Sequence, residues 1–250
     1  VKNSFKVALT TLLIPLQLLA QNYQIVPDES GLERKSPSMQ DVKTRKLMLD
    51  NGVRVYLISD PMAKKSAAAL SVGAGQWNDP KAYPGTAHFL EHMLFMGTKK
   101  YPDEAAYHKF VSDNGGIANA YTAFDRTVYG ASVNNQAFPA FLDRFHDFFI
   151  DPTLSTGSIA KEFKAVDNEN ELCKGKDGWR QINVIKETAN PNHPFSAFAV
   201  GNAETLGEIP PSSLRGWFED HYSSEQMCVC LYSNMPLDEM TAICSTTFAN

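Results

Sequence analysis

Three polar side chains interrupt the apolar segment PGTAHFLEHMLFMG, which runs from Pro84 to Gly97. If this segment is a helix, His88 and His92 lie one turn apart at positions i and i+4, with Glu91 between them on the same side. Two imidazoles at this spacing can bind one Zn²⁺, which accepts nitrogen ligands at tetrahedral angles. Glu91 cannot easily be a third ligand from the same turn, but it can take a proton from a water that the metal activates. The order His-x-x-Glu-His is the inverse of the commoner order in zinc proteases, and it predicts a catalytic metal site.

A zinc site of this kind needs a third protein ligand, with the fourth position left to water. The segment EFKAVDNENE offers carboxylates on a long helix that is predicted to start near Thr156 or Ser158 and to continue past Glu171. Glu162 and Glu169 are seven residues apart, so they lie on one face of that helix, whereas Glu171 points elsewhere. The third ligand is therefore Glu169 or Glu162, and the other is left for a supporting or substrate-facing role.

Alternating apolar runs and turn signals predict the elements that position this site. KLMLDNGVRVYLISD predicts a β-hairpin, and SAAALSVGAGQ, GGIANAYTAFDRTVYGASV and MCVCLYS predict further strands. The zinc helix is expected at about 87 to 96 with Thr86 as its N-cap, and other helices are expected over 103–114, in AFPAFLDRFHDFFID and in TLGEIPPSSLRGWFEDHYSSEQ. Strands in hairpins separated by helices predict an α+β fold, a largely antiparallel sheet with helices packed on it.

The N-terminal segment differs from the rest of the chain. Lys2 and Lys6 precede a mostly apolar run from Val7 to Ala20, which predicts a secretory signal peptide over residues 1–20; a retained amphiphilic extension is the alternative. A polar linker over 21–42 and a domain over 43–250 are expected to follow. The protein is accordingly expected to be periplasmic or secreted. The apolar run is too short and too broken for a stable membrane span.

Composition excludes several other classes of protein. Of the 250 residues, 43% are hydrophobic, and the net charge of −5 is dispersed along the chain, as in an ordinary globular protein without a basic patch for nucleic acid. The four cysteines are too few for a disulfide scaffold in a chain of this length. Cys228 and Cys230 share one face of a predicted strand and are interpreted as core residues, because their spacing suits a structural zinc site poorly. His108, on a predicted amphipathic helix, is interpreted as a surface or boundary residue.

Beyond the five-residue pattern His-x-x-Glu-His, the sequence resembles the inverzincin zinc metallopeptidases of the pitrilysin and insulin-degrading enzyme family. HFLEHMLFMGTKKYPDEAAYHKFVSDNGGIANAYTAFDRTVY is similar to the signature of that family's first domain. EFKAVDNENE, DGWRQI, NPNHPFSAFAVGNAETL and YSSEQM follow in the family's order. The similarity covers about residues 42–249 and is closest to the large pitrilysin and insulysin branch.

This resemblance implies a role for each matched residue. It implies that His88, His92 and Glu169 bind one Zn²⁺ per chain, that Glu91 is the general base, and that Glu162 supports the site without binding the metal. It also implies that GIANAYTA is an edge strand that pairs with an extended peptide, with Asn119 and Ala120 beside the scissile bond. Trp179 would lie near the zinc helix, although an ordinary core aromatic is an equally good interpretation.

The activity implied is zinc-dependent endopeptidase hydrolysis of a peptide or small-protein substrate. Relatives in this branch contain four such domains in two halves, and this chain would be the first domain, so the C-terminal half of the same enzyme is an expected partner. Efficient turnover without that half is not expected. A second hypothesis is a non-catalytic peptide-binding or assembly subunit with the same fold. A structural zinc domain is disfavoured, because it would require a closed set of four ligands.

Overall fold

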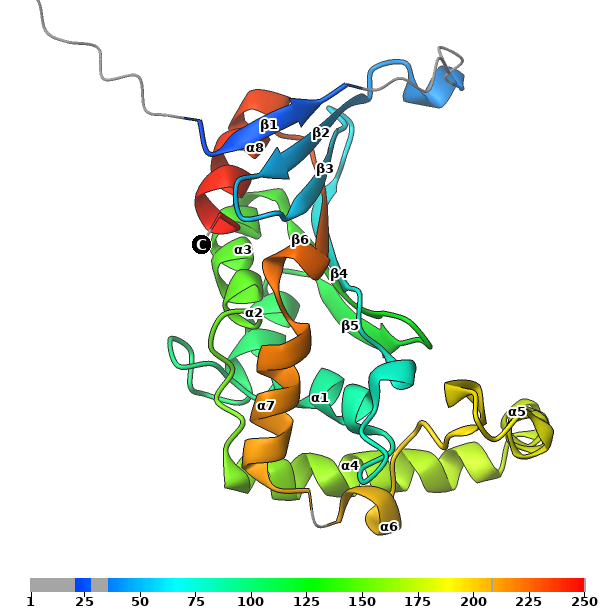
Figure 1. Cartoon of the computed structure of the whole chain (residues 1–250). Coiled ribbons are helices and arrows are strands. Elements are labelled where there is room, and N and C mark those ends of the chain that lie inside the picture. The colour runs from blue at the N-terminus through cyan, green and yellow to red at the C-terminus, as the bar shows by residue number, and fades with distance from the viewer. Residues whose placement is uncertain (1–20, 28–35, 208, 250) are drawn as a thin grey trace, which may run out of the picture.

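The computed structural model describes residues 21–27, 36–207 and 209–249. In this part of the chain, helices pack along a seven-stranded sheet (Figure 1). The strands are β1 (Tyr23–Val26), β2 (Lys43–Leu49), β3 (Arg54–Ser59), β4 (Lys65–Val72), β5 (Ile117–Thr122), β6 (Thr127–Asn134) and β7 (Met227–Ser233). The α-helices are α1 (Thr86–Leu94), α2 (Ala106–Asp113), α3 (Phe138–Asp147), α4 (Thr156–Lys174), α5 (Asp177–Thr188), α6 (Ala203–Leu206), α7 (Pro211–His221) and α8 (Leu237–Thr247).

The strand order across the sheet is β1-β2-β3-β7-β4-β6-β5. Neighbouring strands are antiparallel except for β3 and β7, which run parallel. The prediction of an α+β fold with a largely antiparallel sheet is therefore confirmed. Strand β5 lies at one end of this order, so it forms an edge of the sheet.

The core lies between the helices and one face of the sheet. Every second residue of β4 from Ser66 to Val72 is buried, and β6 and β7 show the same alternation. Helix α1 packs against β5 and β6 and is buried on most of its sides, including Phe89, Leu90 and Met93. The helix that carries the candidate ligands is therefore held in a close-packed environment instead of lying on the surface.

The start of α1 differs from the prediction. The N-cap is Gly85, not Thr86, whose hydroxyl instead donates a hydrogen bond to the carbonyl oxygen of Tyr83 (2.6 Å). The carboxylate of Asp79 accepts hydrogen bonds from the N–H groups of Gly85 (2.7 Å) and Ala87 (2.8 Å). Burial raises the pKa of Asp79 to about 7, against the lowering effect of these two hydrogen bonds. A carboxylate from the preceding loop thus takes the place of the expected Thr86 cap at the positive end of the helix.

The predicted linker over residues 21–42 needs correction, because Tyr23–Val26 form strand β1. This strand pairs with β2, with Tyr23 opposite Leu49. Most of its side chains are exposed, so it lacks the apolar alternation by which a half-buried strand is recognised. The predicted signal peptide over 1–20 lies outside the described residues. Among the helices that are described, none combines the length and the apolar character needed to cross a bilayer.

We predict that Gly85→Ala destabilises the protein by about 2 kcal/mol. Gly85 has a φ of +97°, and a Cβ at this position would lie 2.5 Å from the Cα of Gly201. Chemical denaturation monitored by circular dichroism measures the change in the free energy of unfolding. The matched control is Gly216→Ala within α7, where a Cβ meets nothing within 4 Å. This control should be neutral or stabilise by up to about 1 kcal/mol, since alanine favours a helix. Equal stability of the two variants would contradict the packing described for Gly85.

Candidate metal centre

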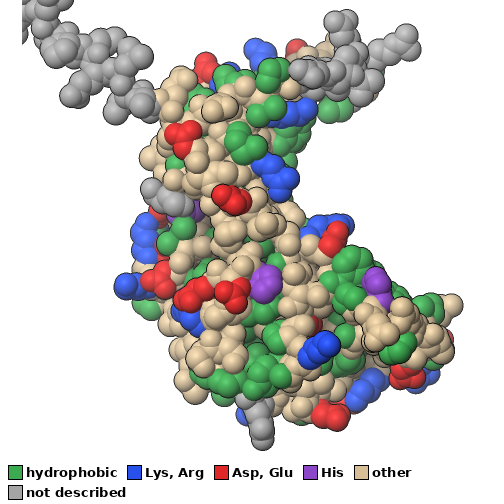
Figure 2. Space-filling view, in the orientation of Figure 1, with side chains coloured by type: hydrophobic (Ala, Val, Ile, Leu, Met, Phe, Trp, Pro, Cys, Tyr) green, Lys and Arg blue, Asp and Glu red, His purple; other side chains and the backbone are tan. Residues whose placement is uncertain are grey.

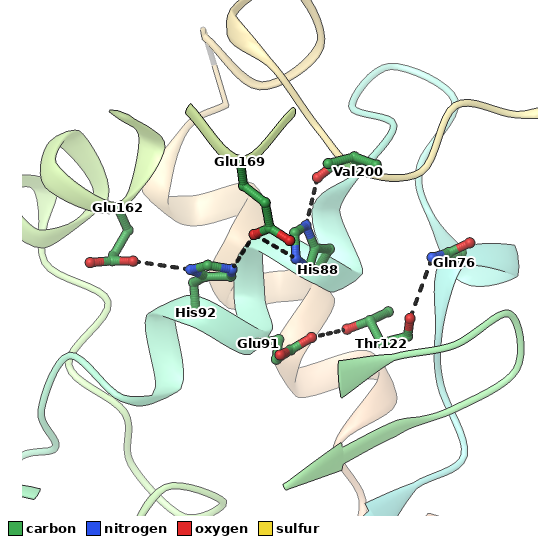
Figure 3. Close-up of polar contacts among 8 residues, drawn as sticks. All are labelled: Gln76, His88, Glu91, His92, Thr122, Glu162, Glu169 and Val200. Carbon is green, nitrogen blue, oxygen red and sulfur yellow. Dashed lines mark hydrogen bonds and ion pairs between the residues drawn. The ribbon is translucent and has the colours of Figure 1, made fainter. Parts of the chain in front are cut away.

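Two helices bring the predicted ligands together (Figure 3). Helix α1 carries His88, Glu91 and His92, and α4 packs beside it with Glu162 and Glu169. Glu169 Oε2 lies 3.6 Å from His88 Nε2 and 3.4 Å from His92 Nε2. In the described part of the chain, His88, His92 and Glu169 form the one group of His, Cys, Asp and Glu side chains whose ligand atoms all lie within 4.8 Å of one another.

These distances fit a tetrahedral zinc ion. Bonds of about 2.0–2.1 Å at tetrahedral angles place two ligand atoms about 3.4 Å apart. The imidazoles are also held from behind, because His88 Nδ1 donates a hydrogen bond to the carbonyl oxygen of Val200 (2.6 Å) and His92 Nδ1 donates one to Glu162 Oε2 (3.2 Å). With the ring protonated at Nδ1, each Nε2 faces Glu169 and can offer its lone pair to a metal once Nε2 carries no proton. His88, His92 and Glu169 can therefore hold one metal ion.

Two carboxylates determine the charge of His92 when no metal is bound. Burial lowers the pKa of His92, but hydrogen bonds to Glu162 and Glu169, together with the negative charges of Glu91 and Glu169, outweigh the burial and raise that pKa to about 9. The hydrogen bond from His92 in turn lowers the pKa of Glu169. The metal-free site therefore holds an imidazolium between two carboxylates, and a metal must displace the proton on Nε2.

Glu91 lies beside the three ligand atoms and is turned toward β5 (Figure 3). It is 7% exposed, and its Oε2 accepts a hydrogen bond from Thr122 Oγ1 (2.6 Å). Burial raises the pKa of Glu91, whereas the hydrogen bond from Thr122 and the neighbouring His88 and His92 lower it. A carboxylate that is mostly desolvated and is held next to a metal site is suited to accept a proton.

The candidate ligands open onto a groove of about 500 Å³. One wall is β5, with Ala118, Asn119 and Ala120, and another wall comes from α4 and α5, with Trp179. Asn119 and Ala120 thus lie in the same groove as the ligands that the sequence singled out. The part of the molecule that contains α5 projects from the body in Figures 1 and 2, and hydrophobic side chains lie on its surface, including Ile182.

Three groups that complete the groove were not identified from the sequence. Thr122 follows the alternation of GIANAYTA, so its side chain lies on the same face as that of Ala120; this pattern could have revealed it once β5 was known to border α1. Val200 contributes a main-chain carbonyl, which every residue carries, so its type gave no signal. His108 is exposed, as expected for a surface or boundary residue, and it also lines the groove with its ring stacked on Phe95.

Comparisons with known proteins agree with this arrangement. Residues 54–195 match the model of the family described as Insulinase (Peptidase family M16). The chain is 39% identical over 225 residues to "Insulin-degrading enzyme-like 1, peroxisomal" of Arabidopsis thaliana, which covers 87% of this chain and 23% of that protein. It is 41% identical over 212 residues to insulin-degrading enzyme of Homo sapiens, covering 82% of this chain and 21% of that protein. It is also 41% identical over 206 residues to Protease 3 of Escherichia coli (strain K12), covering 81% and 21% of the two chains.

The fold agrees as well. The crystal structure of pitrilysin superposes with a TM-score of 0.85 and 38% sequence identity, covering 91% of this chain and 24% of that one. The chain therefore spans about a quarter or less of the length of the relatives that it matches. Because the family model extends over more than half of the chain, including both candidate helices, the chain belongs to the insulinase family of peptidases, peptidase family M16.

Proposed function

We propose that this chain is a zinc-dependent endopeptidase domain that hydrolyses peptides. The observation that carries the proposal is the convergence of His88 Nε2, His92 Nε2 and Glu169 Oε2 on one point, with Glu91 adjacent. Zinc at this point would polarise the scissile carbonyl and lower the pKa of the attacking water to about 7. Within the described residues three side chains converge there, which leaves a position for substrate, as catalytic zinc sites require.

Each nearby residue then has a defined role. His88 and His92 would hold the zinc ion through Nε2, while the Val200 carbonyl and Glu162 fix the orientation of the two rings. Glu91 accepts the proton of the attacking water and passes it to the nitrogen of the leaving amine. The hydrogen bond from Thr122 to Oε2 holds the Glu91 carboxylate in place, so the other carboxylate oxygen is the atom that moves the proton.

Strand β5 is proposed to bind the peptide by main-chain pairing. Its hairpin with β6 closes with a hydrogen bond from the N–H of Ala123 to the carbonyl oxygen of Arg126 (2.8 Å). Because hydrogen-bonded pairs alternate along an antiparallel ladder, Tyr121 and Asn119 direct their main-chain groups toward β6. Ala120 therefore directs its N–H and C=O toward the open edge, where an extended peptide can pair with little sequence preference.

The length of this free edge is limited by Gln76. Its side chain donates a hydrogen bond to the carbonyl oxygen of Thr122 (3.4 Å), and its N–H donates to that of Ala123 (3.0 Å). A peptide that adds to the open edge of β5 is therefore expected to form main-chain hydrogen bonds along the strand as far as Ala120. Beyond Ala120 it is expected to pass Thr122, close to Glu91. This geometry supports the assignment of Ala120, with its neighbour Asn119, to substrate binding.

The wider context of the domain is part of the same proposal. Relatives several times longer than this chain support a role as the N-terminal domain of a larger enzyme, whose C-terminal half is the expected partner. The basic and apolar pattern of residues 1–20 supports export to the periplasm or the exterior. The name of one relative places that protein in the peroxisome, so family membership alone does not decide the compartment.

We predict that Glu91→Gln lowers the rate of peptide hydrolysis by about 10²–10⁴-fold, because it removes the base. The measurement is cleavage of an unstructured, quenched fluorescent peptide by the zinc-loaded full chain. Zinc content should be unchanged, since Glu91 is not among the three ligands. Glu171→Gln is the matched control: this carboxylate is on α4 but pairs with Lys174 and should leave the rate unaffected.

Each alternative outcome of this experiment is informative. Zinc and peptide binding without cleavage by the parent chain would favour the second hypothesis, a peptide-binding subunit that requires another half for turnover. A parent chain that binds no zinc would contradict the metallopeptidase proposal. Cleavage that persists in Glu91→Gln would remove Glu91 from the mechanism.

We also predict that zinc binding at pH 7.5 releases close to one proton, because His92, with its pKa raised to about 9, must lose a proton to become a ligand. Zinc affinity should consequently rise with pH, by up to about tenfold per unit, until pH 9 is reached. Calorimetry in buffers of different ionisation enthalpy counts the protons. Glu162→Gln should release fewer protons, since the amide oxygen can still accept from Nδ1 but the negative charge that stabilises the imidazolium is lost, and it should weaken zinc binding by about 10–100-fold. Identical proton release by the parent chain and by this variant would contradict the pairing of His92 with Glu162.

A further inference from the structure

Another cavity, of about 180 Å³, shares no lining residue with the groove of the metal centre. Strands β4 and β7 contribute to one of its walls, through Leu70 and Met227. The last turn of α3 and the residues that directly follow α3, α7 and α8 form the others. The cavity therefore lies between the sheet and the helices, in a part of the core that neither the metal site nor the proposed peptide site uses.

The walls of this cavity are apolar and largely withdrawn from solvent. Each of the following side chains on the walls is 6% exposed or less: Val53, Leu70, Phe149, Met227 and Phe248. Ile150 also lines the cavity and is 47% exposed, so it marks where the cavity reaches the surface. An apolar cavity of about 150 Å³ can stay free of water and bind benzene. The cavity of this protein thus has room for one aromatic ring with a small substituent.

The hydroxyl groups on the walls already have hydrogen-bond partners. Tyr222 Oη shares a hydrogen bond with Tyr129 Oη (2.7 Å). Ser224 Oγ donates a hydrogen bond to the carbonyl oxygen of Asn51 (2.6 Å). Neither hydroxyl group therefore requires a ligand to satisfy it.

His146 differs from the other polar side chains of the cavity. Its half-buried ring meets Phe248 edge-on (centroids 5.3 Å apart, planes at 89°), but neither ring nitrogen has a hydrogen-bond partner among the described residues. Burial lowers the pKa of His146 and outweighs the nearby carboxylates of Asp143 and Asp147, which raise it. The imidazole is therefore neutral at pH 7, with one N–H group and one nitrogen lone pair to offer.

We infer that this cavity binds a small phenol, a single aromatic ring that carries one hydroxyl group. The ring of the ligand packs against Phe149 and Phe248, and its hydroxyl group donates a hydrogen bond to the unprotonated nitrogen of His146. A charged ligand is disfavoured, because none of the side chains that line the cavity is Lys, Arg, Asp or Glu. The inference concerns a site apart from the groove and does not rest on the proposed peptidase function.

The test is a calorimetric titration of the full chain with phenol and, separately, with toluene, which has a ring of the same size but no hydroxyl group. We expect one phenol to bind per chain with a Kd of about 1 mM or less. His146→Phe keeps an aromatic ring and removes both nitrogens. It should weaken phenol binding by about tenfold, because the hydroxyl group is then buried without a partner, and should change toluene binding by no more than about twofold.

Two further variants locate the ligand. Val53→Phe places a ring inside the cavity and should abolish the binding of both ligands, provided that its circular dichroism and zinc content match those of the parent. Ile150→Trp changes a residue that is 47% exposed, which leaves the core intact, and should weaken both ligands by about threefold or more. Ile185→Trp on α5 is the matched control, since Ile185 is 49% exposed and does not line the cavity; it should leave both affinities unchanged.

Each contrary outcome overturns the inference. Phenol that shows no saturable binding to the parent chain would contradict the site itself. Binding that survives Ile150→Trp and a folded Val53→Phe would place the ligand elsewhere, and an equal loss in Ile185→Trp would show a non-specific effect. Equal weakening of phenol and toluene by His146→Phe would remove the hydrogen bond to His146, and with it the selection of a phenol.

Discussion

The candidate metal centre depends on the hydrogen bonds that the two imidazoles make through Nδ1, on the side of each ring away from Glu169. His88 Nδ1 is bonded to the carbonyl oxygen of Val200, and His92 Nδ1 is bonded to Glu162. Both rings are thereby fixed in the orientation that turns Nε2 toward Glu169. Neither acceptor belongs to α1, so the packing of α4 and of the loop around Val200 against α1 is a condition for metal binding.

The burial of α1 creates the electrostatic character of the site. An apolar helix in the core would ordinarily exclude charged side chains, because an unpaired buried charge is costly. Here each carboxylate has specific donors: Thr122 for Glu91, and the N–H groups of Gly85 and Ala87 for Asp79. The same burial raises the pKa values of both carboxyl groups. The core therefore positions a base and adjusts its proton affinity at the same time.

All groups invoked for metal binding, proton transfer and peptide pairing come from one domain-sized chain that spans about a quarter or less of its relatives. Edge strand β5 connects the proposed roles, because it contains Ala120, which is proposed to pair with a peptide, and Thr122, whose hydroxyl donates a hydrogen bond to Glu91. In the proposed function, peptide position and proton transfer are therefore coupled through a few residues of one strand.

Much of this protein follows from local sequence patterns. The helix that carries the His-x-x-Glu-His pattern, the α+β fold and most other helices and strands were predictable. Helical and strand periodicities are properties of neighbouring residues. The choice between Glu169 and Glu162 was not settled by spacing, since both lie on one face of α4. Only the packing of α4 on α1 brought Glu169 Oε2 to both Nε2 atoms and Glu162 to Nδ1. Strand β1, the Val200 carbonyl and the place of His108 in the groove were also decided by tertiary structure, because contacts between distant segments leave no periodic signal in the chain.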